Sequence, residues 1–121
     1  MIESFRISVG NAPVKFLSFS QRKYVGFRNQ YEYDRKRLLI ASDSAFCIIG
    51  YDIDENPQEL INTQVSEEEE IKHVSFIDDE RPQFVILITK NKRKPQMINR
   101  LLKIKKENDR DVISVMNEME N

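Results

Sequence analysis

Residues 38–53 read LLIASDSAFCIIGYDI, and the rest of the chain is interpreted outward from this stretch. Its two ends, residues 38–41 and 46–51, are rich in aliphatic, β-branched and aromatic side chains, which favour strands. Between them stand Ser42, Asp43 and Ser44, whose short polar side chains bond their own backbone and favour turns. The stretch therefore predicts a β-hairpin.

Further strands are predicted on both sides of this hairpin. Residues 13–19 are apolar and aromatic with partial alternation, and residues 71–77 are a similar segment. Residues 84–88, FVILI, are continuously apolar, which is typical of a strand covered on both faces. The residues between 52 and 70 include four consecutive glutamates and are predicted as a connection, with room for a short helix beginning at Pro57. The result is a set of about five strands.

The C-terminal part changes its period. Asn108 is a suitable helix N-cap, and acids follow it where they favour the helix dipole. Apolar residues then recur at i, i+3, i+4 and i+7, which predicts an amphipathic helix. Its apolar stripe consists of Val112, Val115, Met116 and Met119. Residues 97–104 are compatible with either a helix or a final strand.

Length and composition favour one soluble domain. The chain has 121 residues, of which 40% are hydrophobic and 32% charged. No apolar run approaches the roughly 18 residues of a membrane helix, and the first residues do not resemble a signal peptide. The one cysteine, Cys47, excludes an internal disulfide and favours a reducing compartment. We therefore expect a nuclear or cytoplasmic protein that is not secreted.

The charges are unevenly distributed although the net charge is −1. Residues 21–37 carry a net +4 and residues 90–106 a net +8, whereas residues 52–80 carry −10 and residues 107–121 carry −4. The two basic segments would form one stripe if the fold brought them together. The alternative is that they are two solvated loops offset by an acidic one.

The sequence contains no recognisable motif for nucleophilic catalysis, metal binding or phosphate binding. His73 is the only histidine, and it lies in a predicted strand, where a packed or surface role is more common than catalysis. No Cys/His cluster has metal-ligand spacing, and three glycines do not build a phosphate-binding loop. Cys47 stands among apolar neighbours and is interpreted as a buried hydrophobe. We therefore expect no catalytic residues, no metal, no cofactor and no small-molecule substrate.

Two features are candidates for binding. The first is an aromatic and basic stretch, because cations contact phosphates and flat rings stack on bases of single-stranded nucleic acid. Its candidate residues are Arg22, Lys23, Tyr24, Phe27 and Arg28. The alternative is that the rings point into the core and the cations are solvated. The second feature is the C-terminal stripe, which either packs on its own domain or binds partner helices, with methionines adapting to the partner surface.

The order of these elements resembles an oligonucleotide-binding barrel. That fold has five strands, with a connection between the third and the fourth. In this chain a C-terminal helix is expected to follow them. Residues 38–53 resemble its second and third strands, and residues 71–77 and 84–88 its fourth and fifth. The whole chain is similar in order and size to the smallest subunit of replication protein A or of the telomeric CST complex. The resemblance implies a structural subunit whose terminal helix joins larger subunits.

A competing resemblance is to WD-repeat propeller blades. Residues 38–53 resemble two strands of a blade and residues 70–88 the next pair, although Tyr51-Asp52 stands where the repeat has Trp-Asp. A closed propeller needs at least four blades of about 40 residues, so this reading implies a fragment. A pleckstrin-like sandwich with a terminal helix is a third candidate.

Together these observations predict an all-β fold: a five-stranded OB-like barrel over residues 1–107 and a C-terminal amphipathic helix over residues 108–121, in one domain. The predicted function is that of a non-catalytic subunit of a single-stranded DNA or telomere-binding complex. Its expected partners are larger protein subunits, with single-stranded DNA as a second candidate and no membrane contact. The alternative is a protein-interaction module without nucleic-acid contact.

Overall fold

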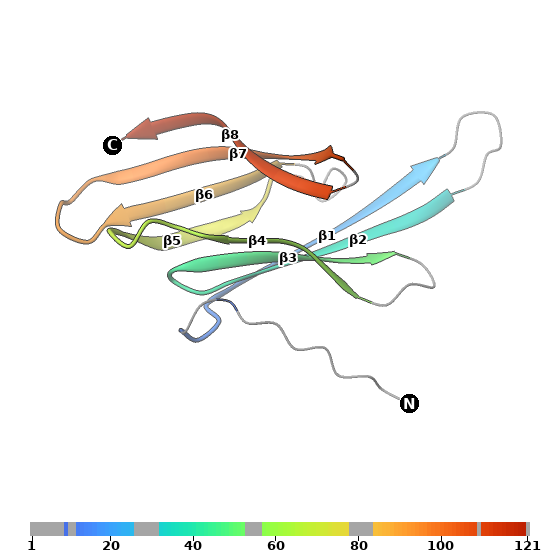
Figure 1. Cartoon of the computed structure of the whole chain (residues 1–121), viewed down its shortest axis with the longest axis horizontal. Helices are drawn as coiled ribbons and strands as arrows, with labels where there is room; N and C mark the ends of the chain where they lie inside the picture. The colour runs from blue at the N-terminus through green and yellow to red at the C-terminus, as the bar shows by residue number, and fades with distance from the viewer. Residues whose placement is uncertain are drawn as a thin grey trace.

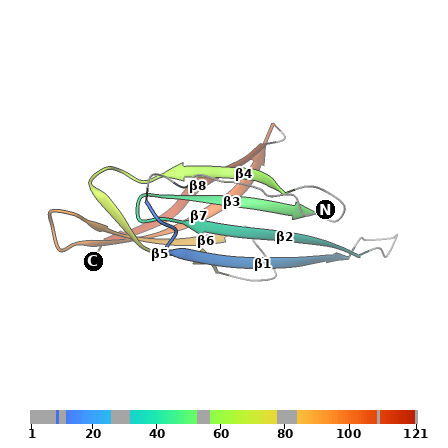
Figure 2. The ribbon, with the colours of Figure 1, turned by 90° about the horizontal axis from the view of Figure 1, so that it is seen from below.

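A computed structural model describes residues 9, 12–25, 32–52, 57–77, 84–108 and 110–120, with residues 21–25, 32–35, 51–52 and 106 described by their backbone alone. The described chain forms eight strands in two antiparallel sheets (Figure 1; Figure 2). The first sheet contains β1 (Phe16–Val25), β2 (Glu32–Ala41), β3 (Ala45–Asp52) and β4 (Gln58–Gln64). The second sheet contains β5 (Glu69–Phe76), β6 (Phe84–Asn91), β7 (Met97–Glu107) and β8 (Arg110–Glu120).

The two sheets lie one over the other as two layers. In each sheet the strands are ordered as they occur in the chain, so every neighbouring pair is a simple antiparallel ribbon. Between the layers, β1 contacts β5 and β4 contacts β8. We call the face of each sheet that is turned toward the other sheet its inner face, and the opposite face its outer face.

One hydrophobic core fills the space between the inner faces. Along β6, buried residues alternate with partly exposed ones, as expected when a strand has one face on a core. The buried members of this core are Leu39, Ala41, Phe46, Ile48, Ile61, Ile71, Val74, Phe76, Val85, Leu87 and Leu102. Because both sheets contribute to one core, neither sheet buries its inner face without the other.

The turn between β2 and β3 connects the two layers. Within the turn, the Ser42 hydroxyl accepts hydrogen bonds from the backbone nitrogens of Ser44 and Ala45, both at 3.2 Å. The turn also accepts hydrogen bonds from residues on either side of the β4–β5 connection: Val65 N, just after β4, donates to Ser44 O at 2.9 Å, and Ile71 N of β5 donates to Asp43 O at 2.7 Å. The chain therefore passes from the first sheet to the second across this turn.

The outer face of the first sheet is partly covered by the N-terminal part of the chain. Val9 packs there against Ala45, Cys47 and Ile49 of β3, and all four residues are buried. With Phe46 and Ile48 in the inter-sheet core, every residue of β3 from Ala45 to Gly50 is buried. The second sheet differs, because Ile86 and Ile88 on the outer face of β6 are partly exposed.

The hairpin at residues 38–53 and the strands at residues 71–77 and 84–88 are found as β2 with β3, β5 and β6. The five-stranded barrel is wrong. The described strands form two four-stranded sheets with separate edges, and neither closes on itself. The predicted connection at residues 52–70 contains β4, and the short helix suggested after Pro57 is this strand. Residues 97–104, left open between helix and strand, are part of β7.

The predicted C-terminal helix over residues 108–121 is also wrong, since residues 110–120 form β8. Glu107 pairs with Arg110, so Asn108 lies in a hairpin turn, with φ 49°, rather than at a helix N-cap. Leu101 pairs with Asn117 and Leu102 with Val115, which makes Met116 the extra residue of a β-bulge. Because the bulge at Met116 shifts the alternation of β8 by one residue, the apolar residues of this strand recur at intervals that resemble those of a helix.

The described residues contain no helix of the length and apolar character that crossing a membrane would require.

Candidate functional site

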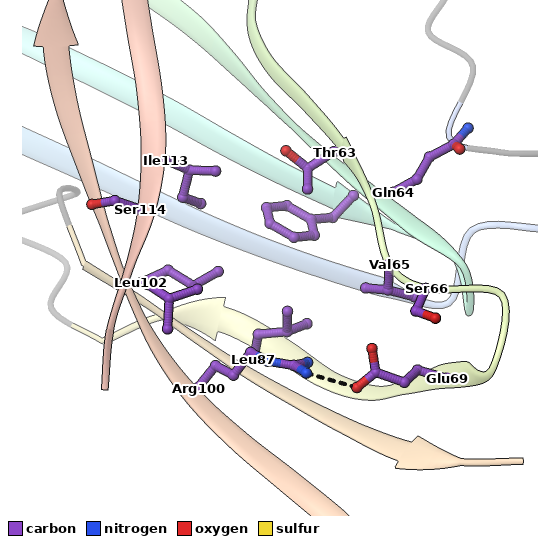
Figure 3. Close-up of a pocket in the computed structure, with 12 residues that line it drawn as sticks. Thr63, Gln64, Val65, Ser66, Glu69, Leu87, Arg100, Leu102, Ile113 and Ser114 are labelled. Atoms are coloured by element: carbon purple, nitrogen blue, oxygen red, sulfur yellow. Dashed lines mark hydrogen bonds and ion pairs between the residues drawn. The ribbon is translucent and has the colours of Figure 1, made fainter. Parts of the chain in front are cut away.

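A cavity of about 220 Å³ lies between the sheets on the side where β4 approaches β8 (Figure 3). Its walls are mainly apolar and include Phe46 of β3, Leu87 of β6, Leu102 of β7 and Ile113 of β8. Binding sites for drug-sized ligands usually measure roughly 300–1,000 Å³. This cavity is therefore smaller than a typical site for a drug-sized ligand or cofactor.

A polar cluster forms one wall of the cavity. Arg100 Nη2 lies 2.8 Å from Glu69 Oε1, and the side chains of Arg100 and Glu69 are only 17% and 11% exposed (Figure 3). Thr89 Oγ1 donates to the same Glu69 oxygen at 2.9 Å and accepts from Arg100 Nη1 at 3.2 Å. Arg100 Nε donates to Glu118 Oε1 at 3.0 Å. The cluster thus joins β5, β6, β7 and β8.

All three guanidinium nitrogens of Arg100 are engaged in these bonds. A charged pair removed from water is stable only when such additional hydrogen bonds satisfy both partners. The arrangement therefore holds the four strands in register. The sequence analysis missed this cluster, because Glu69 stands in a run of glutamates and Arg100 in a basic segment, and both were interpreted as solvated.

The outer face of the second sheet carries a second candidate site. Strand register places Ile86 of β6 directly opposite Leu101 of β7, and Asn99 opposite Met119 of β8. Directly opposed residues share a face of the sheet. A shallow hollow of about 110 Å³ on this face is lined by Ile86, Leu101, Asn117 and Met119, among others. Apolar side chains from three neighbouring strands therefore meet at a surface open to solvent.

The four predicted partner-binding residues do not form one stripe. Met119 lies on the outer face, and Val112, opposite Lys105 in the ladder, lies there too, partly buried. Val115 lines the inter-sheet cavity, and Met116 is the bulge residue. Val115, Met116 and Met119 are 57%, 54% and 58% exposed, respectively. Strand alternation and the bulge distribute them over two faces of β8.

The predicted nucleic-acid residues can be placed only in part. Arg22, Lys23 and Tyr24 lie in β1, opposite Arg35, Asp34 and Tyr33 of β2. Phe27 and Arg28 lie outside the described residues, and of the side chains at 22–24 nothing is described.

The β6–β7 connection, which carries part of the second basic segment, does not come together with the ends of β1 and β2. The ends of β1 and β2 at Val25 and Glu32 point to one end of the molecule, and the β6–β7 connection lies at the other end (Figure 1; Figure 2). Residues 21–25 and 92–94 therefore do not share a surface.

The residues considered for catalysis occupy ordinary positions. His73 Nε2 lies 3.0 Å from Ser75 Oγ, two residues along the exposed face of β5, and the His73 ring contacts Phe16 edge-on. Cys47 is buried on the outer face of β3, and burial, with the nearby Glu59 carboxylate, raises the pKa of its thiol to about 11. Over the described ranges, no three His, Cys, Asp or Glu side chains are grouped to hold a metal ion.

Comparison with protein-family models, with curated proteins and with solved structures found no match to this chain.

Proposed function

We propose that the protein is a non-catalytic protein-interaction module that binds its partner through the second sheet. Four-stranded antiparallel sheets with strands in chain order are the unit of propeller blades, which serve as binding platforms. The polar cluster of Arg100, Glu69 and Thr89 ties β5, β6 and β7 of this sheet together. A single-stranded DNA complex is less well supported, because the basic β6–β7 connection lies at the other end of the molecule from the ends of β1 and β2.

The observation that carries the proposal is the half-covered outer face of β6. A strand that is continuously apolar is normally covered on both faces. Val85 and Leu87 are buried in the core, whereas Ile86 and Ile88 are partly exposed beside the exposed Met119. Exposed apolar side chains that gather on one face make it a candidate interaction site. The competing candidate is the outer face of the first sheet, where Leu17 and Phe19 of β1 are exposed.

The test compares two substitutions that each place a carboxylate on an exposed apolar position. Met119→Asp changes the outer face of the second sheet, and Leu17→Asp changes an even more exposed position of the first sheet. The full chain is purified from its native cells with an affinity tag, and stoichiometric partners are quantified. We expect Met119→Asp to lose the partner and Leu17→Asp to keep it.

Both variants should stay folded, which urea denaturation verifies, because each side chain is more than half exposed. Equal retention of the partner by both variants would contradict the proposal. So would tight binding of a labelled oligonucleotide that weakens steeply between two salt concentrations, since that dependence is the signature of phosphate contacts.

A further inference from the structure

We propose, building on the function above, that the outer face of the second sheet binds a protein whose apolar contact surface is bordered by carboxylates. The proposal rests on how charges are placed around the apolar residues of this face. The two central rows are Ser75, Ile86, Leu101 and Asn117, and His73, Ile88, Asn99 and Met119. Their apolar members are Ile86, Ile88, Leu101 and Met119. The next row toward one end pairs Phe84 with Lys103, and the row after it pairs Lys105 with Val112.

Lys103 and Lys105 border the apolar rows without an acid opposite them in the ladder. Lys103 lies between Phe84 and Ser114, and its ammonium is 5.8 Å from the centre of the Phe84 ring. Lys105 is exposed and lies opposite Val112. These two cations are therefore available to a partner.

The acids of the same face are already opposed by cations. Glu70 pairs with Lys90 in the ladder and lies 3.4 Å from the Lys72 ammonium, and Glu107 is opposite Arg110. Glu118 and Glu120 lie on the inner side, opposite Arg100 and Ile98. Among the described residues, the outer face thus has an apolar centre and, at one end, two lysines with no acid opposite them, and a partner carboxylate beside Lys103 and Lys105 would complement it.

This pattern argues against two other occupants. A second copy docked through the same face around a two-fold axis would add the same uncompensated lysines to the interface. A nucleic acid would need cations along its whole path, whereas apolar side chains in the centre of this face separate Lys103 and Lys105 from Lys90. The favoured occupant is therefore a different protein with an acidic border.

The test uses two double variants of the full chain with the same change in net charge. Lys103→Glu with Lys105→Glu reverses the border of the face, and Lys92→Glu with Lys94→Glu reverses two exposed lysines in the β6–β7 connection. Affinity is measured for the partner protein recovered in the preceding experiment. We expect the border variant to bind about 10-fold more weakly or worse and the control variant to bind within about 2-fold of the unmodified chain.

Carbodiimide cross-linking supplies an independent readout, because it joins a lysine amine to a carboxylate in direct contact. We expect cross-links from Lys103 or Lys105 to an Asp or Glu of the partner. Equal affinities of the two double variants, or cross-links that join Lys103 to a second copy of this chain, would overturn the inference. If Met119→Asp abolishes binding while the border variant does not, only the acidic character of the partner is wrong. If Met119→Asp leaves binding intact, the proposed docking face itself is wrong.

Discussion

β3 and β6 are both interior strands with continuous apolar runs, yet they are covered differently. Around β3, the core covers one face and Val9 covers part of the other, so that all residues from Ala45 to Gly50 are buried. In β6, only the residues facing the core are buried. A continuous apolar run thus indicates a strand with apolar side chains on both faces. In β6 the described chain buries only the face that packs on the core.

The largest effect is expected from placing the same charge on the outer face of each strand. Ile49→Asp buries a carboxylate under Val9, and we expect it to lower the free energy of unfolding by about 4 kcal/mol or more. Ile88→Asp places the carboxylate at a partly exposed position, and we expect a loss of about 1–2 kcal/mol. Urea denaturation measures both values. Similar losses would show that β6 is as completely covered as β3.

A second prediction concerns the cluster that braces the second sheet. Arg100→Met leaves the Glu69 carboxylate buried without its cation, and we expect a loss of about 3 kcal/mol in the free energy of unfolding. Adding Glu69→Gln to this variant removes the uncompensated charge and should restore part of the stability. If the double variant is no more stable than Arg100→Met alone, the charge on Glu69 is not the cause of the loss.

The third prediction concerns the Cys47 thiol, for which we expect little effect on stability but a large difference in alkylation rate. A pKa near 11 instead of 9.0 leaves about 100-fold less thiolate at pH 8, so Cys47 should react slowly with iodoacetamide. Moving the cysteine to the open face, as Cys47→Ala with Ile88→Cys, should give much faster labelling. Equal labelling rates would contradict the conclusion that the outer face of β3 is buried and that of β6 is partly exposed.

The raised pKa of the Cys47 thiol also makes the free energy of unfolding depend on pH. The folded protein holds the thiol proton more tightly than the unfolded chain, so its contribution to stability is complete below pH 9 and is lost as the pH rises toward 11. Stability measured across this range should fall more for the unmodified chain than for Cys47→Ala, because lysines and tyrosines titrate in both.

Local sequence patterns were sufficient for the hairpin of β2 and β3. The turn residues Ser42 to Ser44 between two apolar runs predict β2 and β3, and the register confirms that hairpin. The helix over residues 108–121 failed because the β-bulge at Met116 gives a strand an apparent helical spacing. In that segment the β-branched Val112, Ile113 and Val115 were the better indication.

The candidate site was not accessible to this reasoning, because it depends on contacts between distant parts of the chain. Glu69 and Arg100 are 31 residues apart and meet only after three strands pair. Likewise, the open outer face of β6 is recognised only once the cover over β3 is known. The apolar run at residues 84–88 correctly predicted a strand, but the expected cover on both faces is not found among the described residues, since Ile86 and Ile88 are partly exposed.

The turn between β2 and β3 has a consequence for how tightly a partner is held. Main-chain hydrogen bonds from Val65 and Ile71 to this turn set the orientation of the second layer against the first. A binding surface that is already rigid loses little conformational entropy when it is occupied. Loosening this turn, although it lies outside both candidate sites, would therefore shorten the lifetime of a bound complex without removing any contact to the partner.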